Sequence, residues 1–119
     1  MKIKLSMSRT EGIALLSAVL NCNRFYNWAY GITVIRNPNN TVSKIILHAQ
    51  DGNTPKKFTL TPEVLMRGAN LAIQPEADIN RTIKDTIQSG DFMAVDLIMD
   101  IIVQFGLFGQ YVYKDKVRL

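Results

Sequence analysis

Residues 31–63 read GITVIR-NPNN-TVSKIILHAQ-DG-NTPKKFTLTPE, and this stretch decides the fold. The runs at 31–36, 41–50 and 57–61 are rich in β-branched and aromatic residues, which favour strands. Between them, Asn-Pro-Asn-Asn and Asp-Gly are turn sequences, because proline presets φ and asparagine tolerates the left-handed region. The pattern predicts an antiparallel meander of three strands.

Helical signals begin where the meander ends. Thr61-Pro62-Glu63 supplies a capping hydroxyl, a proline at the first helical position and an acid in the first turn. This helix is expected to run toward Ile73. Isoleucines four residues apart at 79–87 predict a second helix, closed by Ser-Gly. A third helix is predicted over 91–108, capped by its first residue, and 110–114 is predicted as a last strand.

Upstream of the meander, residues 2–7 alternate charged and apolar side chains, which predicts a strand with one buried face. Ser8 and Glu11 have the spacing of a capping box, so a helix should follow. The apolar face of that helix is expected to include Ile13, Leu16 and Leu20. The order of elements predicts an α+β fold with an antiparallel sheet, formed as a single domain over 1–119.

Composition excludes several classes of protein. The chain has 119 residues with one cysteine and one histidine, so an intrachain disulfide and a cysteine-based zinc site are excluded. A Ser/His pair could use only His48, and Ser43 points to the opposite face of the same predicted strand. Asp96 and Asp100 could share acid–base work or hold a metal, but the pattern favours the solvated side of a helix. We expect no enzyme, catalytic residue, metal or cofactor.

Charge and size indicate the kind of partner. The net charge is +4 and the arginines are isolated, which suits a few localised phosphates better than a long nucleic-acid backbone. A chain this short has little room for a deep pocket beside its core. This favours a site between subunits of a homo-oligomer, either a hexamer or a dimer-based assembly. The apolar stretch at 97–108 is too short to span a bilayer, and no signal-peptide pattern precedes it, so a cytoplasmic protein is expected.

The segment 24–30, Arg-Phe-Tyr-Asn-Trp-Ala-Tyr, is the best candidate for a binding site. A guanidinium pairs with phosphate, aromatic rings stack on bases, and asparagine hydrogen-bonds an adenine edge. The candidate ligand-binding residues in this segment are Arg24, Phe25, Asn27, Trp28 and Tyr30. A core aromatic cluster at a helix-to-strand corner is the alternative.

Two further groups complete the predicted site. Arg67 and Asn70 share one helix face around Gly68, and a mid-helix glycine indicates a close backbone approach, a ligand or a helix crossing. The aromatic C-terminal region adds Phe105, Tyr111 and Tyr113. For both groups a structural role, on the helix surface, in the core or in a subunit contact, is the alternative.

Three motifs together resemble a family of small bacteriophage proteins. They are the aromatic corner Tyr26-Asn27-Trp28-Ala29, the junction TLTPEVLxRG at 59–68, and the terminal DxxxDIIVQFGLFGQYVY at 96–113. One branch that the sequence resembles is the phage Thoeris anti-defence sponge proteins. The resemblance implies an oligomeric α+β protein that sequesters a cyclic ADP-ribose isomer between protomers. Some members of that branch also hold cyclic oligonucleotides.

These inferences predict a phage protein that works in the cytoplasm of the infected bacterium and removes an immune signalling nucleotide without cleaving it. A sponge needs positive groups for a pyrophosphate and aromatic faces for adenine, and the candidate residues supply both. The alternative is a phage inhibitor or accessory protein that binds a host protein complex or single-stranded nucleic acid.

Overall fold

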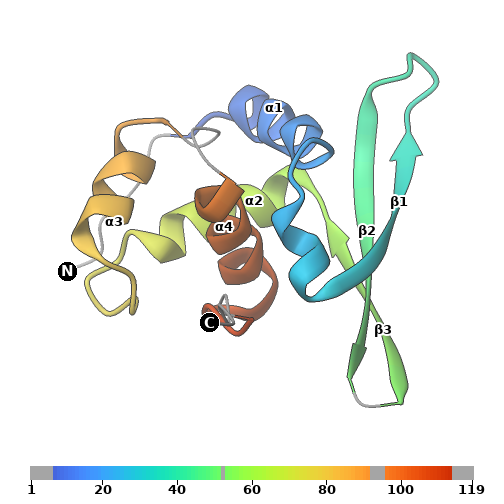
Figure 1. The fold of residues 1–119 in the computed structure, drawn as a ribbon. Helices are drawn as coiled ribbons and strands as arrows, with labels where there is room; N and C mark the ends of the chain where they lie inside the picture. Colours follow the sequence, from blue (N-terminus) through green and yellow to red (C-terminus); the bar gives the residue numbers. More distant parts are fainter. Residues whose placement is uncertain (1–6, 52, 92–95, 114–119) are drawn as a thin grey trace.

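Figure 1 shows the helices gathered on one side of a three-stranded sheet. The structure is a computed structural model that describes residues 7–51, 53–91 and 96–113. The described residues form one compact domain of the predicted α+β class. Its elements are α1 (Arg9–Val19), the 3₁₀ turn η1 (Arg24–Asn27), β1 (Ala29–Arg36), β2 (Val42–Asp51), β3 (Thr54–Leu60), α2 (Pro62–Ala72), α3 (Arg81–Gln88) and α4 (Asp96–Phe108).

The sheet has the order β1-β2-β3 with both pairings antiparallel, which confirms the meander. Ile45 of β2 pairs with Val34 of β1 and with Leu60 of β3, so apolar side chains align on the face toward the helices. β3 begins three residues earlier than predicted. The reason is that Asp51 pairs with Thr54, which carries the hairpin ladder up to its turn despite the weak strand preference of Pro-Lys-Lys.

The helix caps form as the sequence predicts. The Ser8 hydroxyl accepts a hydrogen bond from the Glu11 N–H at 3.1 Å, and the Glu11 carboxylate accepts one from the Ser8 N–H at 2.9 Å. The Thr61 hydroxyl accepts from the N–H of Val64 at 3.2 Å. Gly90, with φ +93°, follows the end of α3 in the left-handed conformation that glycine favours.

Helices α2 and α4 cross where each contributes a glycine. A Cβ atom on Gly68 would overlap the carbonyl oxygen of Ile102, and one on Gly106 would overlap the carbonyl oxygen of Val64. The backbones of the two helices therefore touch. Of the roles that the sequence left open for Gly68, a close backbone approach at a helix crossing is observed.

The core lies between the inner face of the sheet and α1, α2 and α4. It is apolar except for a few polar side chains, and one of them, Gln104, is fully buried. The largest fully buried side chains are Phe25, Leu15, Leu16, Ile45, Leu47, Leu60, Leu65, Ile73, Ile87, Ile101, Ile102 and Gln104.

Two predictions about helix faces are wrong. Ile13 was expected on the apolar face of α1 but is 37% exposed, because Leu15, Leu16 and Val19 form the face that meets the core. Asp100 was expected on the solvent side of α4 but is only 1% exposed. Its burial is possible because polar groups from other elements surround it, as described below.

Other predictions fall at the limits of the described residues. The N-terminal strand at 2–7 and the start of the third helix at 92–95 lie outside them, apart from Met7, and α4 is described from Asp96. Residues 110–113 form no strand, so the predicted last strand is wrong for the part that the structure describes. The backbone of Tyr113 pairs with a side chain instead of the sheet.

Candidate functional site

The predicted binding segment at 24–30 divides between the interior and the surface. In a 3₁₀ turn, side chains three residues apart point the same way. Phe25 and Trp28 accordingly both turn inward, with their rings edge to face at 6.3 Å. Asn27 and Tyr30 both turn outward, and Tyr30 is 66% exposed. The core-cluster alternative therefore describes the inward half, and ligand binding stays a prediction for the outward half.

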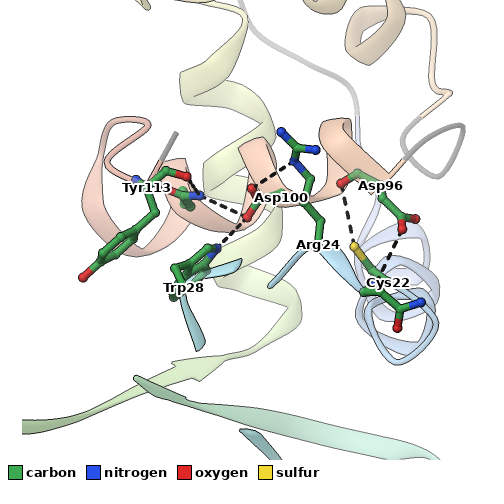
Figure 2. A network of polar contacts seen from close by, with 8 residues as sticks. Cys22, Arg24, Trp28, Asp96, Asp100 and Tyr113 are labelled. Carbon is green, nitrogen blue, oxygen red and sulfur yellow. Dashed lines mark hydrogen bonds and ion pairs between the residues drawn. The ribbon is translucent and has the colours of Figure 1, made fainter. Parts of the chain in front are cut away.

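The inward half joins a polar network around Asp100 (Figure 2). One carboxylate oxygen of Asp100 accepts hydrogen bonds from Trp28 Nε1 at 2.9 Å and from Gln104 Nε2 at 3.0 Å. Nε of Arg24 lies 3.5 Å from the other oxygen. Removing a carboxylate from water costs free energy. The guanidinium of Arg24 and the two hydrogen bonds from Trp28 and Gln104 offset that cost. Arg24 therefore neutralises a buried charge of the chain itself.

Gln104 also attaches the C-terminal segment to α4. Its Nε2 donates to the carbonyl oxygen of Tyr113 at 3.0 Å, and the Tyr113 N–H donates to its Oε1 at 2.6 Å. The ring of Tyr113 then stacks on Trp28 with centroids 4.9 Å apart and planes 2° from parallel. Three predicted site residues, Arg24, Trp28 and Tyr113, are thus linked through Asp100 and Gln104.

The single cysteine lies beside this network. The Cys22 thiol donates to the backbone oxygen of Asp96 at 3.7 Å, and the Asn23 N–H donates to the Asp96 carboxylate at 3.4 Å. The pKa of the Cys22 thiol is raised to about 11, mainly by burial and to a smaller extent by the negative charges of Asp96 and Asp100. The thiol is protonated at neutral pH, which makes it a poor nucleophile.

Arg67 and Asn70 bind the backbones of the helices. Arg67 donates from Nε and Nη2 to the carbonyl oxygen of Gly106, at 3.2 and 2.5 Å. This carbonyl lies in the last turn of α4, where a positive charge is favourable. Asn70 donates to the carbonyl oxygen of Met66 within α2, at 3.2 Å. Arg67 therefore links α2 to α4, and Asn70 bonds within α2.

Phe105 and Tyr111 line a separate pocket of about 370 Å³ near the C-terminal ends of α2 and α4. Two of its side chains, Glu76 and Asp78, are acidic, and none of the described residues that line it is basic. Carboxylates repel phosphate, so this pocket differs in chemistry from the predicted nucleotide site. The described residues that line it are Leu71, Gln74, Glu76, Ala77, Asp78, Phe105, Gly109, Gln110 and Tyr111.

The outward half of 24–30 continues onto the side of the sheet opposite the core. We call this surface the outer sheet face. By strand alternation it comprises Tyr30, Gly31, Thr33, Ile35, Lys44, Ile46, His48, Lys57 and Thr59. Several of these side chains are exposed, and in Figure 1 the labelled helices lie on the other side of the sheet.

Tyr30 and His48 meet at the centre of this face. A β-bulge places both Tyr30 and Gly31 opposite His48, and a bulge of this kind re-aims a side chain. The rings of Tyr30 and His48 lie 6.2 Å apart, and Thr33 Oγ1 is hydrogen-bonded to His48 Nε2 at 2.7 Å. Lys57 of β3 pairs with His48 from the other side. An exposed ring, an imidazole and an ammonium therefore share one row.

Sequence reasoning selected Tyr30 but missed His48 and Lys57. These residues come from other strands, so no local motif joins them to the 24–30 segment. The signal that could have found them is the alternation in β2, where buried Ile45, Leu47 and Ala49 leave His48 on the outer side.

Charge is distributed unevenly along the chain. Residues 29–60, which form the sheet, contain four basic residues and one acidic residue. Residues 61–113, which include α2, α3 and α4, contain three basic and seven acidic residues. An anionic ligand is therefore attracted to the sheet and repelled by the helical part.

Comparisons with protein families, with curated proteins and with solved structures find no match to this chain. Within the described ranges, no helix has the length and apolar character that crossing a membrane requires. Those same ranges contain no group of three or more His, Cys, Asp or Glu side chains that could hold a metal ion.

Proposed function

We propose that this chain is a non-catalytic binding protein that takes up a small anionic nucleotide on its outer sheet face and holds it without cleaving it. The observation that carries the proposal is the row formed by Tyr30, His48 and Lys57. The exposed Tyr30 ring offers a base a stacking surface, worth about 1–3 kcal/mol. Lys57 offers positive charge and hydrogen-bond donors to phosphates, and the imidazole of His48 adds ring nitrogens that can hydrogen-bond a ligand.

The affinity that sequestration requires indicates a homo-oligomer. Competition with a receptor needs nanomolar affinity, about −12 kcal/mol, and an open sheet surface on one protomer supplies only part of that. We propose that a second copy covers the face, so that the working form is a homo-oligomer. The resemblance of the sequence to small bacteriophage proteins, one branch of which is the Thoeris anti-defence sponges, leads us to propose a cyclic ADP-ribose isomer as the ligand, removed from the cytoplasm of an infected bacterium.

The first test measures ligand-induced stabilisation and molar mass. Cyclic ADP-ribose isomers, cyclic dinucleotides and linear nucleotides are added separately while the melting temperature is recorded. We expect one cyclic nucleotide to raise it and to be released chemically intact after heating. Recovery of a cleaved product would instead identify an enzyme, and a melting temperature that no nucleotide changes would refute the proposal.

Matched variants locate the site. Tyr30→Ala and Lys57→Gln should each weaken binding about tenfold, through lost stacking and lost charge pairing. Tyr26→Ala removes another exposed tyrosine that does not face His48, and Lys56→Gln removes the neighbouring lysine, which strand alternation directs to the opposite side. If the controls weaken binding as much as the test variants, the outer sheet face is not the site.

A second candidate function is the binding of single-stranded nucleic acid. It is favoured by the separation of Lys44 and Lys57, which lie on different rows of the outer sheet face and so spread positive charge beyond one nucleotide. For such a ligand the logarithm of the affinity should fall steeply with the logarithm of salt concentration, because phosphate contacts release counterions. A nearly flat salt response, with preference for a cyclic nucleotide over an oligonucleotide, favours the first function.

A further inference from the structure

The pocket of about 370 Å³ near the ends of α2 and α4 lies outside the proposed nucleotide site. Leu71 lies in the last turn of α2 and Gln74 just beyond it, and Phe105 lies in the last turn of α4 with Gly109 just beyond it. Tyr111 completes its apolar lining. The volume is within the usual range for small-molecule sites.

The electrostatics of this pocket favour a cation. Both helices end at it, and the C-terminus of a helix carries partial negative charge. Glu76 and Asp78 add two carboxylates, while the described lining includes no lysine or arginine. Arg67, the nearest arginine in α2, is directed to the carbonyl of Gly106 and is not part of the lining.

The chain itself shows that this end of α2 accepts an ammonium. Lys84 of α3 places Nζ 2.7 Å from the carbonyl oxygen of Gln74 and 3.4 Å from that of Pro75. Lys84 lines a neighbouring pocket of about 320 Å³, and Gln74 lines the acidic one. Carbonyls just beyond α2 therefore already coordinate a cationic side chain from within the molecule.

We propose that the pocket between the ends of α2 and α4 binds an organic cation, a primary ammonium or guanidinium carried on an apolar arm. The arm is matched by the apolar walls of Leu71, Ala77 and Phe105, and the cation is matched by Glu76 and Asp78. The same chemistry could be presented by a free amine or by a lysine or arginine side chain of a protein, including a second copy of this chain. This site is independent of the nucleotide site.

The test uses n-butylguanidinium and its neutral analogue n-butylurea, each titrated into the isotopically labelled protein. We expect saturable shifts of the backbone amide signals of Gln74 and Tyr111 with the cation, and none with the neutral analogue up to the same concentration. Equal binding of both probes, or no saturable shift with the cation, would overturn the proposal.

Variants test the role of the carboxylates. The double variant Glu76→Gln, Asp78→Asn should weaken butylguanidinium binding roughly five- to tenfold, because each exposed carboxylate contributes modestly. Both residues are exposed, so the fold should persist. Asp85→Asn, an exposed acid of α3 outside the lining, is the matched control and should leave binding unchanged. Unchanged binding in the double variant would contradict the site.

A blocked peptide separates the two sources of the cation. Acetyl-Ala-Arg-Ala-amide carries the same guanidinium on a backbone. Binding equal to that of butylguanidinium indicates that the pocket admits a protein side chain, whereas loss of binding indicates a free amine. Either result supports an organic cation as the ligand.

Discussion

The α2–α4 crossing and the outer sheet face each contain a glycine, and the two glycines are present for opposite reasons. A Cβ at Gly68 would overlap the carbonyl of Ile102, whereas a Cβ at Gly31 would meet no atom within 4 Å. At the crossing, the missing side chain lets two backbones touch. On the sheet, it leaves the surface beside Tyr30 open. The buried glycine therefore serves packing, whereas the strand glycine has open space where a side chain would be.

Substitution of these two glycines tests the comparison most strongly. Gly68→Ala should lower the free energy of unfolding by roughly 2–3 kcal/mol, even though alanine gains about 1 kcal/mol in a helix, because the helices must separate. Gly31→Ala should leave it nearly unchanged. Urea denaturation of both variants measures the difference. Equal stabilities would show that the crossing adjusts without cost.

Substitutions in the polar network around Asp100 should have the next largest effect on the free energy of unfolding. Asp100→Asn keeps the shape of the side chain but removes the charge that balances Arg24, so it should cost about 2 kcal/mol of unfolding free energy. Asp96→Asn, at the exposed start of α4 one turn before Asp100, is the control and should cost little. If Asp96→Asn is the more harmful of the two, the carboxylate of Asp100 is not the centre of the network.

The burial of Cys22 should make the free energy of unfolding depend on pH. Because its folded pKa, about 11, is above its ordinary value of 9.0, its contribution to stability is complete below pH 9 and is lost as pH rises through 11. Relative to Cys22→Ala, the native protein should therefore lose on the order of 1–2 kcal/mol between pH 8 and pH 11. Chemical denaturation at both pH values checks this expectation, and parallel curves would argue against it.

The exposed ion pair between Arg9 and Glu63 should have the smallest effect on stability. Arg9 donates to Glu63 at 2.6 Å and lowers the pKa of the carboxyl, so the pair favours folding above the ordinary pKa of Glu63 and loses that effect as pH falls. Both side chains are well exposed, and water and salt screen them. Arg9→Gln should barely change the melting temperature at neutral pH, and less still at high salt. A large change would mean that surface contacts matter as much as the interior.

Features set by neighbouring residues could be predicted from the sequence. The capping box of Ser8 and Glu11, the start of α2 at Thr61 and the meander all depend on residues a few positions apart. The position of Gly68 within a helix also limited its role to three possibilities. These are local relations, and they survive packing because tertiary contacts do not oppose them.

The network around Asp100 could not be predicted, because its members are distant in sequence. Trp28 and Arg24 lie more than 70 positions from Asp100, and a helical aspartate is usually solvated. The candidate residues of the sequence accordingly separate into the network, the helix crossing, the acidic pocket and the outer sheet face. Of the candidate residues, Tyr30 is the one on the outer sheet face, where a nucleotide is proposed to bind.

Residues 29–60, which form the sheet, carry more basic than acidic side chains, and residues 61–113, which include α2, α3 and α4, carry more acidic than basic ones. Two copies attract each other when the basic sheet of one faces the acidic helices of the next. Such a contact is heterologous, since each copy holds its neighbour with one surface and is held by another. The rotation between successive copies would then set the number in a closed ring, and raising the salt concentration would take the ring apart.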